Sequence, residues 1–396
     1  MSDVTCFTSS VILAGDDLRE IKDQALIVQS GRIIKIGDPE GAEKRVNLNG
    51  KLLCPMFIDT HTHVGDTGAK ELGVGLPLQK VVNPPDGMKH RFLHEVQGSE
   101  LHINMMRHAL LEMLSNGIIA HADFREQGLE GIRSLRRAAR GLPIWVVALG
   151  RMTEGASLEQ LEIEARAILE EADGLGIRDS KSYPLPLLVQ LRSEYPEKIF
   201  AAHAGENYNS EMQSRQKNGC GQAGWLAQCH PDFLIHLVYT APDELRLLAD
   251  AGIRGVGCPR ANGLLGDGQP KLDEWLHTGM HICLGTDNVM FNSPDMLREM
   301  DYASRISRGQ AHDPAVIDSR AILQAATVEG ARALRLDDDL GSLAAGKEAS
   351  FIVFDLQSLN LTYQHDVVST IVHRATPADI CAIYIKGERM DVRAFM

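Results

Sequence analysis

The sequence has too few basic residues to form a surface that binds nucleic acid. Its 396 residues include 53 Asp and Glu against 40 Lys and Arg, a formal net charge of −13. Phosphate neutralisation requires a basic patch or stripe, which this composition does not supply. No apolar run approaches the roughly 18 residues of a membrane span, and the N-terminal residues do not resemble a signal peptide. We therefore expect a cytoplasmic protein with no nucleic-acid or membrane partner.

Several common site motifs are also missing. The seven cysteines form no C-x-x-C pair, and their odd number favours free thiols over a disulfide framework or a cysteine-based zinc site. No G-x-G-x-x-G follows an opening strand and no Gly-rich loop ends in Lys-Ser/Thr, which argues against dinucleotide or nucleoside-triphosphate binding. The chain also lacks the H-x-E and P-C-x-x-C signature of one class of zinc deaminases.

The central part of the chain alternates short apolar segments with longer amphipathic ones. Repeated β-α units of this number favour an α/β fold with a closed (β/α)8 TIM-type barrel over a doubly wound sheet. The predicted strands are 57–61, 118–124, 143–149, 172–177, 199–203, 233–238, 252–258 and 281–287. The predicted helices include 98–115, 128–140, 157–171, 210–228, 242–251, 272–278 and 294–308.

Both ends of the chain show a strand pattern. The expected strands are 10–14, 24–29 and 32–37 near the N-terminus, and 350–354, 367–372 and 380–387 near the C-terminus. Ser30-Gly31 is typical of a hairpin turn. Because neither end is large enough to fold alone, we predict that they pair into one small β domain. The predicted division is 1–54 plus 341–396 for this domain and 55–340 for the barrel.

Two histidines separated by one residue, His61 and His63, end an apolar strand. Side chains alternate along a strand, so both imidazoles point the same way and can hold one metal ion. An H-x-H can arise by chance among 15 histidines, but a strand end is where barrels place their chemistry. The long non-periodic connection that follows, 64–97 with Asn-Pro-Pro-Asp-Gly at 83–87, is expected to form a lid.

Three later strands end in residues that suit the same site. His203 offers a third nitrogen ligand, and Glu206 can reach a bound water and move its proton, although a Glu is also common at a helix N-terminus. His236 ends the next strand, and Asp287 closes the last one with an oxygen ligand or water-orienting base. The pattern predicts a metal site.

This constellation resembles the amidohydrolase superfamily, in its metal-dependent aminohydrolase branch of cytosine, adenosine and guanine deaminases and triazine hydrolases. The resemblance covers nearly the whole chain. It rests on D-T-H-T-H at 59–63, H-A-G-E at 203–206, His236, C-P-R-A-N-G-L-L-G at 258–266 and G-T-D-N at 285–288. That family sets a β-sandwich of terminal strands beside the barrel, and the same is expected here.

The resemblance also implies the roles of the site residues. One divalent metal ion, most often zinc and otherwise iron or manganese, would be bound by His61, His63, His203 and Asp287. Glu206 would shuttle a proton, Asp287 would also accept one, and His236 would orient the hydroxide or polarise the substrate. The implied reaction is hydrolytic deamination of an amino-substituted nitrogen heterocycle, such as a purine or pyrimidine, by metal-bound hydroxide. The alternative is cleavage of a cyclic amide C–N or ring C–Cl bond at the same site.

Two departures from the family pattern bear on the metal. The family usually has Pro-Gly before its first strand, where this chain has Pro55-Met56. Its binuclear branch uses a carboxylated lysine at the end of the fourth strand, but here only Lys181 lies nearby, several residues late. A single metal ion is therefore expected, with Lys181 in solvent. A non-catalytic protein that kept the barrel would be expected to lose ligands, and none of this set is missing.

The candidates for substrate binding are Arg125, Arg260, Asn262 and His90. Arg125 shares one strand face with His121 and Asp123, which fits either the barrel interior or a buried ion pair. Arg260 and Asn262 either contact substrate or brace their loop. His90 lies with Lys89 and Arg91 in a charged run that meets substrate or forms a solvated face. The expected partners are a small-molecule substrate and a second copy of the chain, since symmetric homo-oligomers are common among soluble enzymes.

Overall fold

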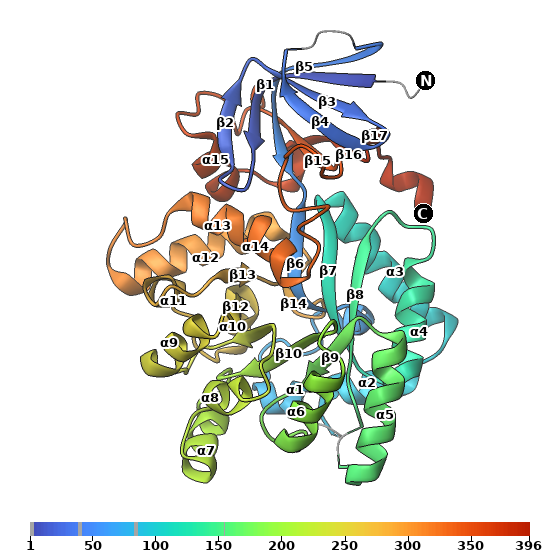
Figure 1. The fold of residues 1–396 in the computed structure, drawn as a ribbon, viewed down its shortest axis with the longest axis vertical. Helices are drawn as coiled ribbons and strands as arrows, with labels where there is room; N and C mark the ends of the chain where they lie inside the picture. Colours follow the sequence, from blue (N-terminus) through green and yellow to red (C-terminus); the bar gives the residue numbers. More distant parts are fainter. Residues whose placement is uncertain (1–3, 39–41, 83–85, 154) are drawn as a thin grey trace.

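Two sheets organise the chain, one in the centre of the sequence and one formed by its two ends (Figure 1). The structure is a computed structural model that describes residues 4–38, 42–82, 86–153 and 155–396. Within those ranges, no helix combines the length and the apolar character that crossing a bilayer requires.

The central sheet is parallel and closes into a barrel. β13 pairs with β12, and β14, which follows β13 after Gly285 and Thr286, pairs with β6 at the other end of the strand order. The two short segments therefore act as one eighth strand, which confirms the predicted TIM-type barrel. The strands are β6 (Phe57–His63), β7 (Ile118–Arg125), β8 (Trp145–Gly150), β9 (Gly174–Ile177), β10 (Ile199–Ala204), β11 (Phe233–His236), β12 (Arg254–Gly257), β13 (Ile282–Leu284) and β14 (Asp287–Asn288).

Most of the helices outside the barrel pack an apolar face against it; α3 (Glu100–Ser115), for example, buries Met106, Leu110 and Met113. The others that follow barrel strands are α4 (Gly128–Ala139), α5 (Leu158–Glu171), α6 (Leu185–Glu194), α7 (Tyr208–Asn218), α8 (Gln222–Ala227), α9 (Pro242–Asp250), α10 (Pro259–Leu265), α11 (Leu272–His277), α12 (Met296–Ala311), α13 (Ser319–Ala325) and α14 (Val328–Ala333).

The single helix predicted for 210–228 is wrong. Gly219 adopts φ +76°, a left-handed conformation that ends α7, and α8 starts three residues later.

The second sheet joins both ends of the chain. Its order is β17-β16-β15-β5-β1-β3-β4, with β2 paired to β1. The predicted hairpin is confirmed, since β3 and β4 pair antiparallel across Ser30 and Gly31, both at positive φ. The division into a terminal β-sandwich and a barrel domain stays a prediction. The strands are β1 (Val4–Ala14), β2 (Arg19–Lys22), β3 (Ala25–Gln29), β4 (Arg32–Gly37), β5 (Lys44–Pro55), β15 (Phe351–Asp355), β16 (Ile380–Ile385) and β17 (Glu388–Arg389).

The strand predicted for 367–372 is a helix, α15 (Val367–His373). The β-branched residues that suggested a strand are buried on one side of this helix. They are Val367, Val368, Ile371 and Val372, a spacing that matches one helix face. The Asp366 side chain accepts hydrogen bonds from the backbone N–H groups of Val368 and Ser369, a typical N-cap. Periodicity and capping therefore outweigh β-propensity here.

The terminal sheet connects directly to the barrel strand that carries the H-x-H motif. β5 leads into β6 with only Met56 between them, and the two lie end to end in Figure 1. Residues of β5 and β15 alternate between two cores: Leu52 and Phe354 belong to the main core with the barrel, whereas Leu53 and Val353 belong to a second core within the terminal sheet. The start of β6 is thereby held in place by both sheets.

Candidate metal centre

The carboxyl ends of three barrel strands bring the four predicted ligands together. His61 and His63 come from β6, His203 from β10, and Asp287 from β14, which pairs in register with Thr62. All four side chains are buried or nearly so. The Phe124 ring of β7 packs against the imidazoles of His61 and His203, with ring centroids 4.6 and 4.9 Å away. Apolar packing inside the barrel therefore fixes the ring positions.

The separations between the candidate ligand atoms fit one zinc-sized ion. His61 Nε2 lies 3.2 Å from Asp287 Oδ1 and 3.2 Å from His203 Nε2, and His63 Nε2 lies 3.6 Å from the same carboxylate oxygen. Atoms at the corners of a tetrahedron with zinc–nitrogen bonds of about 2.0–2.1 Å are about 3.3–3.4 Å apart. The donor set, three imidazoles and a carboxylate, is also one that zinc accepts.

Acceptors on the far side of two imidazoles favour the tautomer with a free Nε2. His203 Nδ1 lies 3.0 Å from the Arg178 carbonyl oxygen, to which it can donate a hydrogen bond. Glu126 Oε1 lies 3.2 Å from His63 Nδ1, a close contact without hydrogen-bond geometry. A proton on each Nδ1 leaves the Nε2 lone pair directed at the site. Burial lowers the pKa of His63 to about 3 and the pKa of His203 well below its usual value, so both rings are neutral. Neutral imidazole is the form that binds a metal.

Asp287 is a carboxylate despite its burial. Burial acts to raise the pKa of Asp287, but the hydrogen bond from His61 and the neighbouring histidines lower it well below the usual range. Its backbone has φ +63°, and His236 has φ +74°, both in the left-handed region that non-glycine residues seldom adopt. Strained backbone of this kind concentrates at functional sites.

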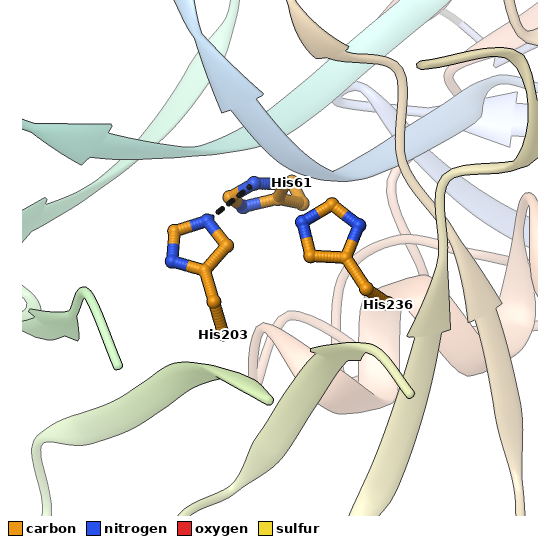
Figure 2. A group of neighbouring side chains, drawn as sticks. All are labelled: His61, His203 and His236. Carbon is orange, nitrogen blue, oxygen red and sulfur yellow. Dashed lines mark hydrogen bonds between the residues drawn. The ribbon is translucent and has the colours of Figure 1, made fainter. Parts of the chain in front are cut away.

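Glu206 and His236 flank the ligand cluster. Figure 2 shows the rings of His61, His203 and His236 facing one another, and nitrogens of the three lie within 4.8 Å of one another. Glu206 Oε1 is 3.5 Å from His236 Nε2, and burial raises the pKa of Glu206 to about 7. A carboxyl group with such a pKa can take up and release a proton at neutral pH.

The turn before Glu206 requires glycine. Gly205 has φ +62°, and a Cβ at this position would lie 2.6 Å from Thr240 Oγ1. The Gly205 backbone N–H donates a hydrogen bond of 3.0 Å to Gln222 Oε1 on α8. These contacts fix the direction in which Glu206 leaves β10.

The cluster lies at the bottom of a small, polar pocket. The cavity is about 130 Å³ in volume and is lined by His63, His203, His236 and Asp287, with Glu206 at its side. A larger groove of about 590 Å³ adjoins it and shares His90, Glu126 and Arg151 with it. The cavity alone is smaller than the roughly 300–1,000 Å³ of typical small-molecule pockets, whereas the adjoining groove falls within that range.

The described parts of 64–97 supply one side of this pocket, and they are helical where a non-periodic loop was predicted. The segment contains a 3-10 helix, η1 (Val64–Ala69), and the helices α1 (Leu78–Val82) and α2 (Met88–Val96). Leu78, Val82, Lys89 and His90 line the pocket from these two helices, which we name the roof. Part of the expected Asn-Pro-Pro-Asp-Gly turn, residues 83–85, lies outside the described residues.

Two of the four substrate-binding candidates lie at the site. His90 lines the pocket, and its Nε2 is 2.8 Å from the Val82 carbonyl oxygen. Asn262 is fully buried with Oδ1 3.4 Å from His236 Nδ1, so it contacts a site residue and not the open cavity. Of the two alternatives for the charged run, the solvated face does not hold for Lys89, because only 3% of it is exposed.

The structure does not support substrate contacts for the other two candidates. Arg125 is fully buried outside the barrel interior, in an ion pair with Asp123 of 3.1 Å. Arg260 Nη1 lies 3.4 Å from Glu299 Oε2 and donates to the Ser293 carbonyl oxygen, so it braces its loop. Strand alternation decides the position of Arg125, and local packing decides that of Arg260. Neither can be recognised from the residue type alone.

Glu126 and Arg151 line the pocket and were missed by the sequence reasoning. Both directly follow barrel strands, β7 and β8. Polar residues at the carboxyl ends of barrel strands are candidates for chemistry, so their position was the available signal. Lys181 behaves as expected, since it is exposed and donates to Gln213 Oε1. The seven cysteines are also free thiols, as predicted.

Known proteins resemble this chain over most of its length. The sequence profile of the amidohydrolase family matches residues 52–390. A protein of Methanothermobacter thermautotrophicus that carries a provisional aminohydrolase name is 33% identical over 76% of this chain and 80% of its own length. A 5-methylthioadenosine/S-adenosylhomocysteine deaminase of Acetivibrio thermocellus is 32% identical over 97% of this chain and 91% of its own.

One solved structure shows the same fold. An adenosine deaminase from Xanthomonas campestris with bound zinc superimposes with a TM-score of 0.85. It is 19% identical and covers 99% of this chain and 96% of its own.

Proposed function

Because the chain belongs to the amidohydrolase family, we propose that it is a metal-dependent deaminase that releases ammonia from an amino-substituted nitrogen heterocycle. The observation that carries the proposal is the position of Glu206 and His236 beside four converging candidate ligands in one pocket. The deaminase names of full-length relatives, one of them 32% identical, support the same reaction class. The substrate class is a purine, a pyrimidine or a related cyclic amidine.

His61, His63, His203 and Asp287 would hold one divalent ion, for which zinc is the best candidate. Such an ion, when bound, acidifies water from a pKa of 15.7 towards about 7 and so supplies a nucleophile at neutral pH. The three neutral imidazoles and one carboxylate leave a net charge of one on a divalent ion, which keeps it electrophilic. Lys181 is exposed, and no second ion is proposed.

Glu206 is proposed to move the proton. The reaction forms a carbon–oxygen bond to water, breaks the bond between ring carbon and exocyclic nitrogen, and needs one proton carried from the water to the departing amine. With a pKa of about 7, the Glu206 carboxylate accepts that proton and returns it to the nitrogen, which leaves as ammonia. Among the described residues, the ion-pair neighbour of Glu206 is His236, whose Nε2 lies 3.5 Å from Oε1, so no lysine or arginine there holds the carboxylate as an anion.

His236 is proposed to donate a hydrogen bond to the oxygen that adds to the ring. Its Nδ1 faces Asn262 Oδ1 at 3.4 Å, which orients the ring so that Nε2 points into the pocket. His90, on the roof, is the proposed contact to a polar group of the substrate. Asn262 thus acts through His236, and its sequence-based role as a direct substrate contact is not retained.

The test is an ammonia-release screen over aminated purines, pyrimidines, pterins and triazines with the metal-loaded protein. Glu206→Gln is expected to abolish release and to keep the metal, because the amide cannot shuttle a proton. Glu194→Gln is the matched control, since Glu194 is an exposed partner of Arg166 and should leave activity unchanged. Ring-opened product or released chloride without ammonia would overturn deamination in favour of amide or C–Cl hydrolysis.

Cytoplasmic location and a homo-oligomeric state are part of the proposal. A light-scattering mass of the purified full chain tests the second point. A mass of about one chain, 43.5 kDa, would contradict it.

A further inference from the structure

A buried carboxylate, Glu126, lies directly behind the metal centre and meets groups from three elements. Only 6% of the residue is exposed. Its Oε1 lies 3.2 Å from His63 Nδ1, 2.7 Å from Lys89 Nζ and 3.3 Å from Arg151 Nη1, and its Oε2 accepts from Arg125 Nη2 at 2.5 Å. One oxygen therefore joins a candidate ligand of β6 to a lysine of the roof.

The contact to His63 has a defined chemical consequence. His63 Nε2 lies 3.6 Å from Asp287 Oδ1, and its Nδ1 lies 3.2 Å from Glu126 Oε1 without meeting the geometry of a hydrogen bond. A carboxylate this close favours a proton on Nδ1, and that tautomer has a free Nε2 lone pair. A carboxylate in this position also makes the imidazole a stronger donor to a metal. The ammonium of Lys89 and the guanidinium groups of Arg125 and Arg151 lie within 3.3 Å of the Glu126 carboxyl oxygens and favour its ionised form.

Lys89 reaches this carboxylate from the roof helix α2. Lysine is almost never buried unless it is paired, and only 3% of Lys89 is exposed. Its Nζ also lies 3.5 Å from Asp66 Oδ2. Asp66 in turn accepts hydrogen bonds from Asn288 Nδ2 and from the Met290 backbone N–H, beside the candidate ligand Asp287. The lysine thus links the roof to the surroundings of two ligands.

We propose that Glu126 is a positioning residue that fixes the His63 imidazole, and that Lys89 ties the roof helix α2 to the metal centre through it. The inference rests on the metal centre of the proposed function, but not on the identity of the substrate. It separates two effects: Glu126 controls how well His63 binds the metal, whereas Lys89 controls how firmly α2 covers the pocket.

Zinc affinity and hydrogen exchange test these two effects in the full-length protein. Zinc chloride is titrated in competition with a chelator of known affinity. Glu126→Gln is expected to weaken zinc binding by about 10- to 100-fold, the usual effect of losing an outer-shell partner. The visible spectrum of the cobalt-loaded variant should also shift, because the orientation of His63 changes the ligand field. Lys89→Met should keep zinc affinity within about threefold while amides of 88–96 exchange at least about tenfold faster.

Two further variants keep the test decisive. Lys70 lies in the same segment, and its ammonium is 3.3 Å from Glu112 in an ion pair on the surface. Lys70→Met should therefore change neither the zinc affinity nor the hydrogen exchange of amides 88–96. If Glu126→Gln fails to fold because three cations lose their partner, the double variant Lys89→Met/Glu126→Gln restores part of the charge balance. It should show the same loss of zinc affinity.

The outcomes separate this inference from the proposed function. Wild-type zinc affinity and an unchanged cobalt spectrum in the Glu126 variants would overturn the positioning role. Unchanged exchange of 88–96 in Lys89→Met would overturn the tie to the roof. A wild-type protein that binds no zinc would instead overturn the metal centre itself.

Discussion

Replacement of Arg125 by Met tests whether this residue is structural, as its surroundings indicate, or binds substrate. Arg125 is fully buried between two carboxylates, with Nη1 3.1 Å from Asp123 and Nη2 2.5 Å from Glu126. Its Nη1 also donates to Met106 Sδ at 3.7 Å. Methionine has an unbranched, flexible side chain that can fill much of the space of the arginine stem. The substitution therefore removes the charge and changes the packing little.

The expected loss follows from the charges that remain. Removal of one partner of a buried ion pair costs about 3–5 kcal/mol, because the other charge stays buried without compensation. Asp123 still accepts from the Val64 backbone N–H at 2.6 Å, and Glu126 still meets Lys89 at 2.7 Å. These contacts place the expected cost near the lower end, about 3 kcal/mol.

The assay is urea unfolding of the metal-free variant and wild type at pH 7. Arg133→Met is the control: Arg133 also forms a two-bond contact with a carboxylate, Glu171, but on the surface, so its loss should cost under about 1 kcal/mol. If Arg125→Met were as stable as wild type but had a raised KM for the substrate, the structural interpretation would be refuted. Arg125 would then be a substrate contact after all.

Three other predictions concern stability. Removal of the metal with a chelator should lower the unfolding temperature, and zinc at about 1,000 times its Kd should restore about 4 kcal/mol; calorimetry with no change on chelation would contradict a bound ion. Gly174→Ala should destabilise the protein by about 1–3 kcal/mol, since the added Cβ would lie 1.8 Å from the Ile199 carbonyl oxygen. Gly309→Ala, in α12, adds a Cβ with no atom within 4 Å and should stabilise the protein by about 0.5–1 kcal/mol. Urea unfolding measures both changes. Burial raises the pKa of Glu299 from 4.5 to about 8 even with Arg260 beside it, so the folded protein holds a proton that the unfolded chain releases. As pH rises from 5 to 8, wild type should therefore lose stability relative to Glu299→Gln. Parallel curves of stability against pH for the two proteins would contradict this.

The sequence reasoning succeeded where a local rule determines a position in space. Alternation along a strand puts His61 and His63 on one side, and parallel strands in a barrel bring their carboxyl ends together. The ligands of β10 and β14 therefore converge with those of β6 although they are more than a hundred residues away. The same rules predicted the eight-strand barrel and the terminal hairpin.

It failed where tertiary contacts decide. Nothing local indicates that Lys89 is buried, because its burial depends on Glu126, which is 37 residues away and comes from another element. Arg125 was assigned to either face of β7 because alternation gives two faces without saying which one meets the barrel interior. The strand predicted at 367–372 shows the other limit, since β-branched residues pack equally well on a helix capped by Asp366.

The central claim is that His61, His63, His203 and Asp287 hold a single catalytic metal ion. Elemental analysis of the purified and zinc-reconstituted chain tests it most directly, with His61→Ala/His203→Ala as the comparison. We predict about one equivalent of zinc, iron or manganese per wild-type chain and close to none in the double variant, with ammonia release following the metal content. Wild-type protein without metal after reconstitution, or a double variant that retains as much as wild type, would contradict the account.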